Sequence, residues 1–207
     1  MATAVKICGI TRVEDGLAAA RAGAHAIGLV FHPASPRFVT IERATEIARS
    51  LPPFVTAVAL FVNPNVATVR AVLERVPVQL LQFHGDETPA LCEQFDVPYL
   101  KAVRMAPGTD LLQYAARYQG AKALLVDAFK EGVYGGSGHA FDWKSIPCDL
   151  PVPVVLAGGL TAQNVAEAVR TVRPWAVDVS SGVEREKGIK DPQLMAAFIR
   201  GARDADV

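Results

Sequence analysis

The 207-residue sequence lacks an excess of charge of either sign and lacks long apolar runs. Lys and Arg number 21, as do Asp and Glu, and no basic run stands out. The composition therefore gives no electrostatic argument for binding nucleic acid or an anionic membrane. Apolar stretches such as Phe54–Val62 are far shorter than the ~20 residues that a helix needs to cross a bilayer. We expect neither a nucleic acid nor a membrane as partner.

Cysteine is also scarce, and the residues that hold metals or nucleotides show no familiar spacing. The three cysteines, Cys8, Cys92 and Cys148, form no CxxC pair, and the N-terminus lacks the apolar core of a secretory signal, which together favour the cytoplasm. The four histidines have no zinc-ligand spacing, and neither a P-loop nor a GxGxxG motif is found, so we expect no metal and no cofactor.

The sequence does contain eight continuous apolar runs, each of a length typical of a strand that is buried on both faces. Amphipathic segments follow, with helix-start residues at Thr11, Thr40, Thr161 and Asp191. Because 51% of residues are hydrophobic and no linker interrupts the chain, residues 1–207 are predicted to form one domain. The expected strands are Val5–Cys8, Ala26–Phe31, Val55–Val62, Val78–Phe83, Pro98–Val103, Ala123–Val126, Val154–Ala157 and Ala176–Val179.

Eight such units predict an α/β fold, a (β/α)8 TIM barrel with eight parallel strands. A doubly wound open sheet uses the same alternation and is the structural alternative. In a barrel, residues at the carboxyl ends of the strands would meet at one face. The loops His32–Thr40 and Lys130–Phe141 are long for so short a chain, and the glycine-rich second loop is predicted to close over substrate.

Two strand ends carry groups suited to acid–base chemistry. Cys8 is followed by Gly9, which permits close approach of backbone and ligand, although a lone cysteine is more often a small buried residue. Asp127 ends an apolar run; it could simply brace the next loop, or burial could raise its pKa as a general acid requires. A cysteine thiolate and a neutral Asp127 would form a base and acid pair.

Other strand ends carry groups suited to binding anions. Gly158 and Gly159 precede a predicted helix, and Ser180, Ser181 and Gly182 follow the last apolar run. Barrels often bind phosphate at these two places, although each motif alone is weak. Arg37, in a proline-restricted loop, could hold a carboxylate or be a solvated charge. His84 is a further candidate for substrate binding, or it could satisfy a loop hydrogen bond.

Strand parity makes a prediction inside the barrel. Residues two apart share a face, so Lys6 points as Cys8 does, and Asp178 points as Ser180 does. Because the first and last strands are neighbours in a barrel and an unpaired buried charge is costly, we expect Lys6 and Asp178 to interact. Lys6 should then favour the Cys8 thiolate, and Asp178 joins the candidate substrate-binding residues.

Seven motifs are spread along the chain: KICGIT at Lys6–Thr11, GLVFHPASPR at Gly28–Arg37, LLQFHG at Leu80–Gly85, LLVDAF at Leu124–Phe129, GGSGHAFDW at Gly135–Trp143, LAGGL at Leu156–Leu160 and DVSSGVE at Asp178–Glu184. Together they resemble the phosphoribosylanthranilate isomerase family. The resemblance extends to the GIKD segment at Gly188–Asp191. KICGIT followed by a sixth-strand aspartate is its most specific part, whereas LAGGL recurs in other phosphosugar barrels.

The resemblance implies an Amadori rearrangement of N-(5′-phosphoribosyl)anthranilate to 1-(o-carboxyphenylamino)-1-deoxyribulose 5-phosphate in tryptophan biosynthesis. Cys8 matches the general base and Asp127 the general acid. Arg37 matches a contact to the anthranilate carboxylate. His139 departs from the family, which often has lysine there. The phosphate site implied by the resemblance comprises Gly158, Gly159, Ser180, Ser181 and Gly182.

Alternatives remain at this stage. A histidine-pathway isomerase uses an aspartate where this chain has Cys8, and indole-3-glycerol-phosphate synthase needs a lysine at the close of the second strand. A non-catalytic module that binds phosphosugars would bind a product analogue without turnover. The expected partner is a small phosphoribosyl substrate, and the chain could be a monomer or a homodimer.

Overall fold

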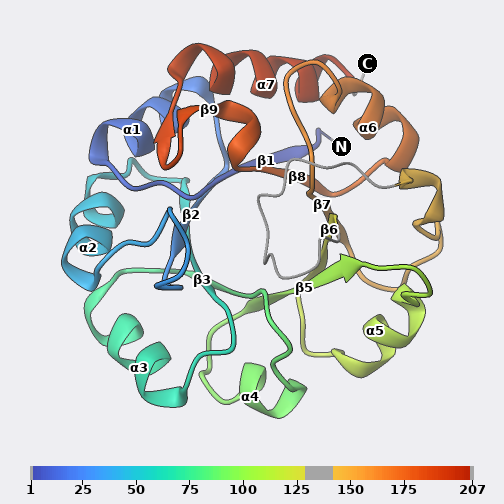
Figure 1. Ribbon diagram of the computed structural model, residues 1–207, viewed down its shortest axis with the longest axis horizontal. Helices are drawn as coiled ribbons and strands as arrows, with labels where there is room; N and C mark the ends of the chain where they lie inside the picture. The colour runs from blue at the N-terminus through green and yellow to red at the C-terminus, as the bar shows by residue number, and fades with distance from the viewer. Residues whose placement is uncertain (1, 129–141, 206–207) are drawn as a thin grey trace.

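The eight apolar runs form the eight parallel strands of one closed barrel, which Figure 1 shows end-on. The computed structural model describes residues 2–128 and 142–205. The barrel closes where β1 pairs with β8, so the predicted barrel is confirmed and the open sheet is wrong. The strands are β1 Ala4–Cys8, β2 Ala26–Val30, β3 Thr56–Phe61, β4 Leu80–Phe83, β5 Tyr99–Met105, β6 Ala123–Ala128, β7 Val154–Leu156 and β8 Ala176–Val179.

Helices surround the barrel as an outer ring (Figure 1). Thr40 and Asp191 cap helices as predicted, each accepting backbone N–H bonds of the first turn. The caps expected at Thr11 and Thr161 are wrong, because Thr11 donates its hydroxyl to the Gly188 carbonyl and α6 begins only after Asn164. The helices are α1 Val13–Ala22, α2 Ile41–Ser50, α3 Val66–Arg75, α4 Pro89–Glu93, α5 Leu111–Arg117, α6 Val165–Val172 and α7 Pro192–Asp204. Within the described ranges no helix has both the length and the apolar character needed to span a membrane.

The strand–helix alternation is interrupted in two places, before β7 and after β8. In the described part of the β6–β7 connection, the only helical element is the single 3-10 turn η1, Trp143–Ser145. Pro147, Pro151 and Pro153 follow it, and proline disfavours a continuing helix. After β8 come the 3-10 turn η2, Ser181–Val183, and an antiparallel hairpin of β9, Glu184–Glu186, with β10, Ile189–Lys190, which the sequence had not predicted.

The core has two parts, one inside the barrel and one between the barrel and its helices. The outer part contains large side chains such as Phe61, Phe83 and Phe198, all fully buried. The barrel interior is filled mostly by smaller residues, as the narrow space inside eight strands requires. They include Leu100, Ala102, Ala123, Leu125, Val155, Ala157 and Ala176. Above this apolar floor the interior becomes polar, and the candidate site begins there.

Candidate active site

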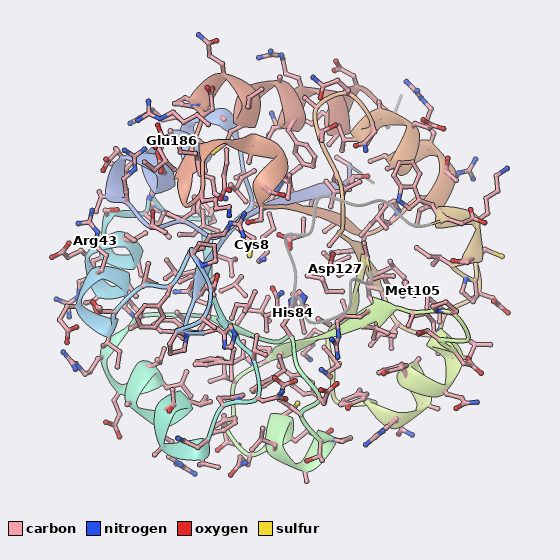
Figure 2. All side chains as sticks on the ribbon, in the orientation of Figure 1. Cys8, Arg43, His84, Met105, Asp127 and Glu186 are labelled. Carbon is pink, nitrogen blue, oxygen red and sulfur yellow. The ribbon has the colours of Figure 1, made fainter. Side chains whose placement is uncertain are left out.

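All ten residues singled out from the sequence line one cavity of about 300 Å³ at the carboxyl ends of the strands. In Figure 2, Cys8, His84 and Asp127 lie around the barrel axis, and they come from three separated strand ends. The structure thus brings together residues that are up to 174 positions apart, from Cys8 to Gly182. The ten are Cys8, Arg37, His84, Asp127, Gly158, Gly159, Asp178, Ser180, Ser181 and Gly182.

A larger cavity, about 1100 Å³, lies at the opposite end of the barrel. Its lining includes Thr3 and Ala4 at the start of β1, Val154 at the start of β7 and Trp175 just before β8. Among the described residues, that lining includes no Asp or Glu. Size therefore does not identify the reactive site, whereas the combination of a thiol, carboxylates and an imidazole at the carboxyl-terminal face does.

Cys8 ends β1 and lies beside a buried ion pair. Lys6 Nζ donates to Asp178 Oδ1 at 2.9 Å, and the two residues are register partners on β1 and β8. Both side chains are buried. The predicted interaction across the closing strands is therefore confirmed, and it follows from strand parity together with the cost of an unpaired buried charge.

The surroundings of Cys8 act on its thiol in opposite directions. Burial raises the pKa of Cys8, and the Asp178 carboxylate raises it further, while the ammonium groups of Lys6 and Lys190 lower it. The net shift of this pKa is upward. Lys6 thus contributes in the predicted direction, but its contribution is smaller than the effect of burial.

Asp127, the second-last residue of strand β6, belongs to a short chain of hydrogen bonds that begins inside the barrel. Its Oδ1 accepts the backbone N–H of Ala128 at 2.8 Å, and its Oδ2 lies 3.1 Å from His84 Nε2. The other ring nitrogen of His84, Nδ1, lies 2.9 Å from Gln82 Nε2. His84 therefore contacts the candidate acid directly, so it is more than a residue that satisfies its own loop.

A second buried ion pair supports the loop that carries His84. Lys101 Nζ donates to Glu87 Oε2 at 2.9 Å and to the carbonyls of Phe83 and Gly85. Glu87 in turn accepts the backbone N–H of Gly85 at 3.0 Å. Both side chains are almost completely buried. The pair thus fixes the backbone on both sides of His84.

Arg37 reaches the cavity with its guanidinium already paired. Its Nε donates to Glu184 Oε1 at 2.7 Å and its Nη2 to Glu184 Oε2 at 2.8 Å. Lys190, fully buried, donates to the same Glu184 Oε1 at 2.8 Å and to the carbonyl of Ser180 at 3.0 Å. Burial raises the pKa of Glu184, but the hydrogen bonds and positive charges of Arg37 and Lys190 outweigh burial, so the net shift of this pKa is downward.

The two glycine-containing segments predicted to bind phosphate pack against each other. Gly158 and Gly159 both have positive φ, 81° and 68°, a conformation that glycine adopts without strain. A side chain at Gly182 would collide with the Leu160 carbonyl. The Asn164 amide donates to the Gly159 carbonyl at 2.9 Å and helps to hold this turn. These contacts place backbone groups of both segments on one wall of the cavity.

Comparison with known proteins agrees with this geometry. Residues 5–201 match the family described as N-(5′-phosphoribosyl)anthranilate (PRA) isomerase. A protein of that name from Dechloromonas aromatica is 56% identical over 206 residues, covering 100% of this chain and 99% of its own. The chain belongs to the N-(5′-phosphoribosyl)anthranilate isomerase family. The resemblance predicted from KICGIT and the other motifs is confirmed.

Solved phosphoribosyl anthranilate isomerases share the whole barrel. The crystal structure from Thermotoga maritima has a TM-score of 0.90 and 38% identity, and covers 98% of this chain and 99% of that one. A second structure, in complex with reduced 1-(o-carboxyphenylamino)-1-deoxyribulose 5-phosphate, has a TM-score of 0.87 with the same identity and the same coverage of both chains. The shared barrel agrees with the closed sheet, and the family match excludes the two other enzyme families considered from the sequence.

Some sequence predictions concern residues that the structure does not describe. The loop from Lys130 to Phe141 that was predicted to close over substrate, including His139, lies outside the described residues. Within residues 2–128 and 142–205, no three His, Cys, Asp or Glu side chains are grouped as metal ligands would be.

Sequence reasoning missed the charged residues that support the site. Glu184 and Lys190 lie in VEREKGIKD, and Glu87 lies in HGDETP, segments whose composition is typical of solvated loops. The available signals were that Glu184 ends the DVSSGVE motif, two residues after Gly182, and that Lys190 lies in the GIKD segment. Their roles become visible only from their buried partners.

Proposed function

We propose that this chain performs the isomerisation of its family with Asp127 as general acid and Cys8 as general base. Asp127 would protonate the furanose ring oxygen of N-(5′-phosphoribosyl)anthranilate, which opens the ring to a protonated Schiff base. Cys8 would then remove the C2′ proton to give an enolamine, and tautomerisation to the ketone yields 1-(o-carboxyphenylamino)-1-deoxyribulose 5-phosphate. The supporting observation is that both residues line one cavity at the reactive face.

The geometry around each residue suits its role. His84 hydrogen bonds with Asp127 Oδ2 and thereby orients the carboxyl group toward the cavity. Burial raises the pKa of Cys8, so positive charge near the thiol is needed to favour the thiolate. The Schiff base formed after ring opening carries that charge, and it adds to the effects of Lys6 and Lys190.

The substrate would lie with its two anionic ends on separate walls. Arg37 would bind the anthranilate carboxylate, because a planar guanidinium matches a carboxylate. Gly158, Gly159, Ser180, Ser181 and Gly182 would bind the phosphate through backbone N–H groups and hydroxyls. Asp178 and His84 complete the candidate substrate-binding residues, both at the polar top of the barrel interior.

Loss of the fluorescence of N-(5′-phosphoribosyl)anthranilate tests the proposal directly. Purified protein should remove this fluorescence without added metal or nucleotide, and the product should be identified by mass and chromatography. A protein that binds the reduced product analogue but gives no turnover would instead be a phosphosugar-binding module, and the proposed activity would be wrong.

We further infer that residues 1–207 act as one isomerase domain in the cytoplasm, as a monomer or a homodimer with a small-molecule substrate as its partner. The closed barrel and the three free cysteines support this inference. Light scattering during size-exclusion chromatography would separate the two oligomeric states.

A further inference from the structure

The β9–β10 hairpin brings two charged side chains into contact with residues that line the cavity. Glu184 is the first residue of β9 and Lys190 the last of β10, and the two are register partners. The hairpin is anchored to the first βα unit: Thr11 donates its hydroxyl to the Gly188 carbonyl, and the backbone N–H of Lys190 donates to Asp15. The positions of both charges are therefore set by backbone pairing as well as by their own contacts. In Figure 1 the hairpin lies beside α1.

Glu184 occupies only one of the two edges of the Arg37 guanidinium. It accepts from Nε and Nη2, which form the side edge of the planar group. A guanidinium has five N–H donors in a fixed plane, so the end edge formed by Nη1 and Nη2 can bind a second carboxylate. The side chain of Arg37 is 12% exposed and lines the cavity.

The stem of Arg37 is also restrained. A Cβ atom added to Gly9 would lie 2.5 Å from Arg37 Cδ and 3.1 Å from Ser180 Oγ. The bare backbone of Gly9 thus makes room for the arginine and for the serine of the predicted phosphate segment. With its stem packed at Gly9 and its side edge bonded to Glu184, the guanidinium has one orientation and one open edge.

Lys190 connects Glu184, the partner of Arg37, to Ser180 of the predicted phosphate segment. Its ammonium group has three donors, and three acceptors lie around it: Glu184 Oε1 at 2.8 Å, the Ser180 carbonyl at 3.0 Å and Ser180 Oγ at 3.4 Å. Because these acceptors match its donors in number, we do not assign Lys190 a direct contact with ligand. It instead holds Glu184 and Ser180 in a fixed relation.

We propose that Glu184 is a positioning residue for substrate selection: it holds the side edge of Arg37 so that the end edge faces the substrate carboxylate, and Lys190 fixes Glu184 to Ser180 of the phosphate segment. The proposal rests on the proposed role of Arg37. Under this proposal, the Arg37–Glu184–Lys190–Ser180 chain of contacts sets the distance between the carboxylate and phosphate subsites.

Two rival interpretations predict different results. If only net charge matters, removal of the Glu184 carboxylate leaves the site more positive and an anionic ligand should bind more tightly. If Glu184 competes with the substrate carboxylate for Arg37, its removal should also tighten binding. A positioning role predicts the opposite, because an unheld arginine must be ordered when the ligand binds.

The test uses Glu184→Gln, which keeps size and removes the charge. Binding is measured by calorimetry for two probes: the reduced product analogue, and the same compound without the ring carboxylate. We expect Glu184→Gln to weaken the carboxylate-bearing probe about 10-fold and the other probe less than about 2-fold. The matched control is Glu186→Gln, which removes the same charge from an exposed position of the same hairpin and should leave both affinities unchanged.

A double-mutant cycle identifies the partner. In an Arg37→Ala background, Glu184→Gln should change the affinity of either probe by less than about 2-fold, since residues that act through one another are not additive. Lys190→Met should weaken both probes, because it releases Ser180 as well as Glu184. In turnover, Glu184→Gln should raise KM while kcat stays within about 3-fold of the wild type.

The outcomes that overturn the proposal are distinct. Tighter binding by Glu184→Gln, equal weakening of both probes, or a full effect in the Arg37→Ala background would each contradict a positioning role. Glu184→Asp is the second variant if Glu184→Gln fails to fold; it keeps the charge but shortens the reach, and should show the same selective loss. Absence of turnover by the wild type would contradict the proposed function alone, because the binding measurements do not depend on turnover.

Discussion

On the β1–β8 side of the cavity, Cys8 lies among charges, whereas on the β4–β6 side Asp127 is bonded to an imidazole and a backbone N–H. Lys6, Asp178 and Lys190 all affect the pKa of the Cys8 thiol. The partners of Asp127 are His84 Nε2 and the N–H of Ala128. The barrel thus surrounds the two proposed catalytic groups with different kinds of neighbours.

The difference matches what each group must do. A buried thiol needs nearby cations to become a thiolate, because burial disfavours the charged form. A carboxyl group that acts as an acid must be able to hold its proton, and a partner such as His84 can bond with it without imposing a fixed positive charge. The imidazole can accept from a protonated carboxyl or donate to an ionised one, depending on its tautomer.

Gln82 extends this flexibility into the barrel. Its amide lies against His84 Nδ1, and its Oε1 is one of two buried side-chain polar atoms without a partner among the described residues. Since an amide can present either oxygen or nitrogen, rotation of Gln82 would let His84 carry its proton on either ring nitrogen. His84 and Gln82 on the acid side can therefore exchange donor and acceptor roles, unlike the Lys6–Asp178 ion pair beside Cys8.

The largest expected effect comes from removing the two groups proposed as base and acid. Cys8→Ala and Asp127→Asn should each lower kcat by at least about 100-fold, the low end for general acid–base catalysis. Substrate affinity should change less, because neither group is proposed to bind an anionic end. Stopped-flow loss of substrate fluorescence gives kcat, and circular dichroism checks the fold. Near-normal kcat in either variant would remove that residue from its role.

The strands could be predicted because their burial appears in the sequence as local apolar runs. Their shared face then follows from the geometry of a barrel. A strand buried on both faces is continuously apolar, and β8 has the predicted bounds, Ala176–Val179. Boundaries shifted where local burial continues or stops: β6 runs on to Ala128, and β4 begins only at Leu80. Strand parity then sufficed to predict the contact between Lys6 and Asp178.

The support of the site could not be predicted, because it depends on pairs that are far apart in sequence. Arg37 and Glu184 are 147 positions apart, and Lys190 looks in the sequence like any lysine of a polar segment. Whether a charged residue is buried depends on a partner that the sequence does not mark. The hairpin that brings Glu184 and Lys190 together has two short strands, ERE and IK, in which every residue but Ile189 is charged. This is the opposite of the apolar pattern that reveals barrel strands.

The second-largest expected effect tests how strongly the charges on the base side act on Cys8. Lys6→Met removes a cation that lowers the pKa of Cys8, so this pKa should rise further above its usual range. Each pKa unit is a tenfold loss of thiolate below the pKa, so we expect alkylation of Cys8 at neutral pH to slow by about 10-fold. The rise of kcat/KM with pH should move in the alkaline direction.

The measurement needs a background in which one thiol reacts. Cys148 is exposed, whereas Cys92 is buried and, unlike the buried Cys8, does not line the cavity. Cys148→Ser therefore leaves Cys8 as the thiol of interest, with peptide mapping to confirm the site. Asp178→Asn combined with Lys6→Met is the control for an unpaired buried carboxylate. An unchanged alkylation–pH curve in folded Lys6→Met would mean that Lys6 is only structural.

The smallest effect tests the acid side. Gln82→Met removes the contact with His84 Nδ1 while keeping a side chain of similar length. The loss of one neutral hydrogen bond, ~1 kcal/mol, should lower kcat about 5-fold. Alkylation of Cys8 should stay within about 2-fold of the wild type, since Gln82 acts through His84 on Asp127 and not on the thiol.

Leu100→Met is the matched control, because Leu100 is the register partner of Gln82 inside the barrel. If Leu100→Met lowers kcat equally, the effect of Gln82 is packing; if Cys8 alkylation slows along with kcat, the two sides of the cavity are not independent.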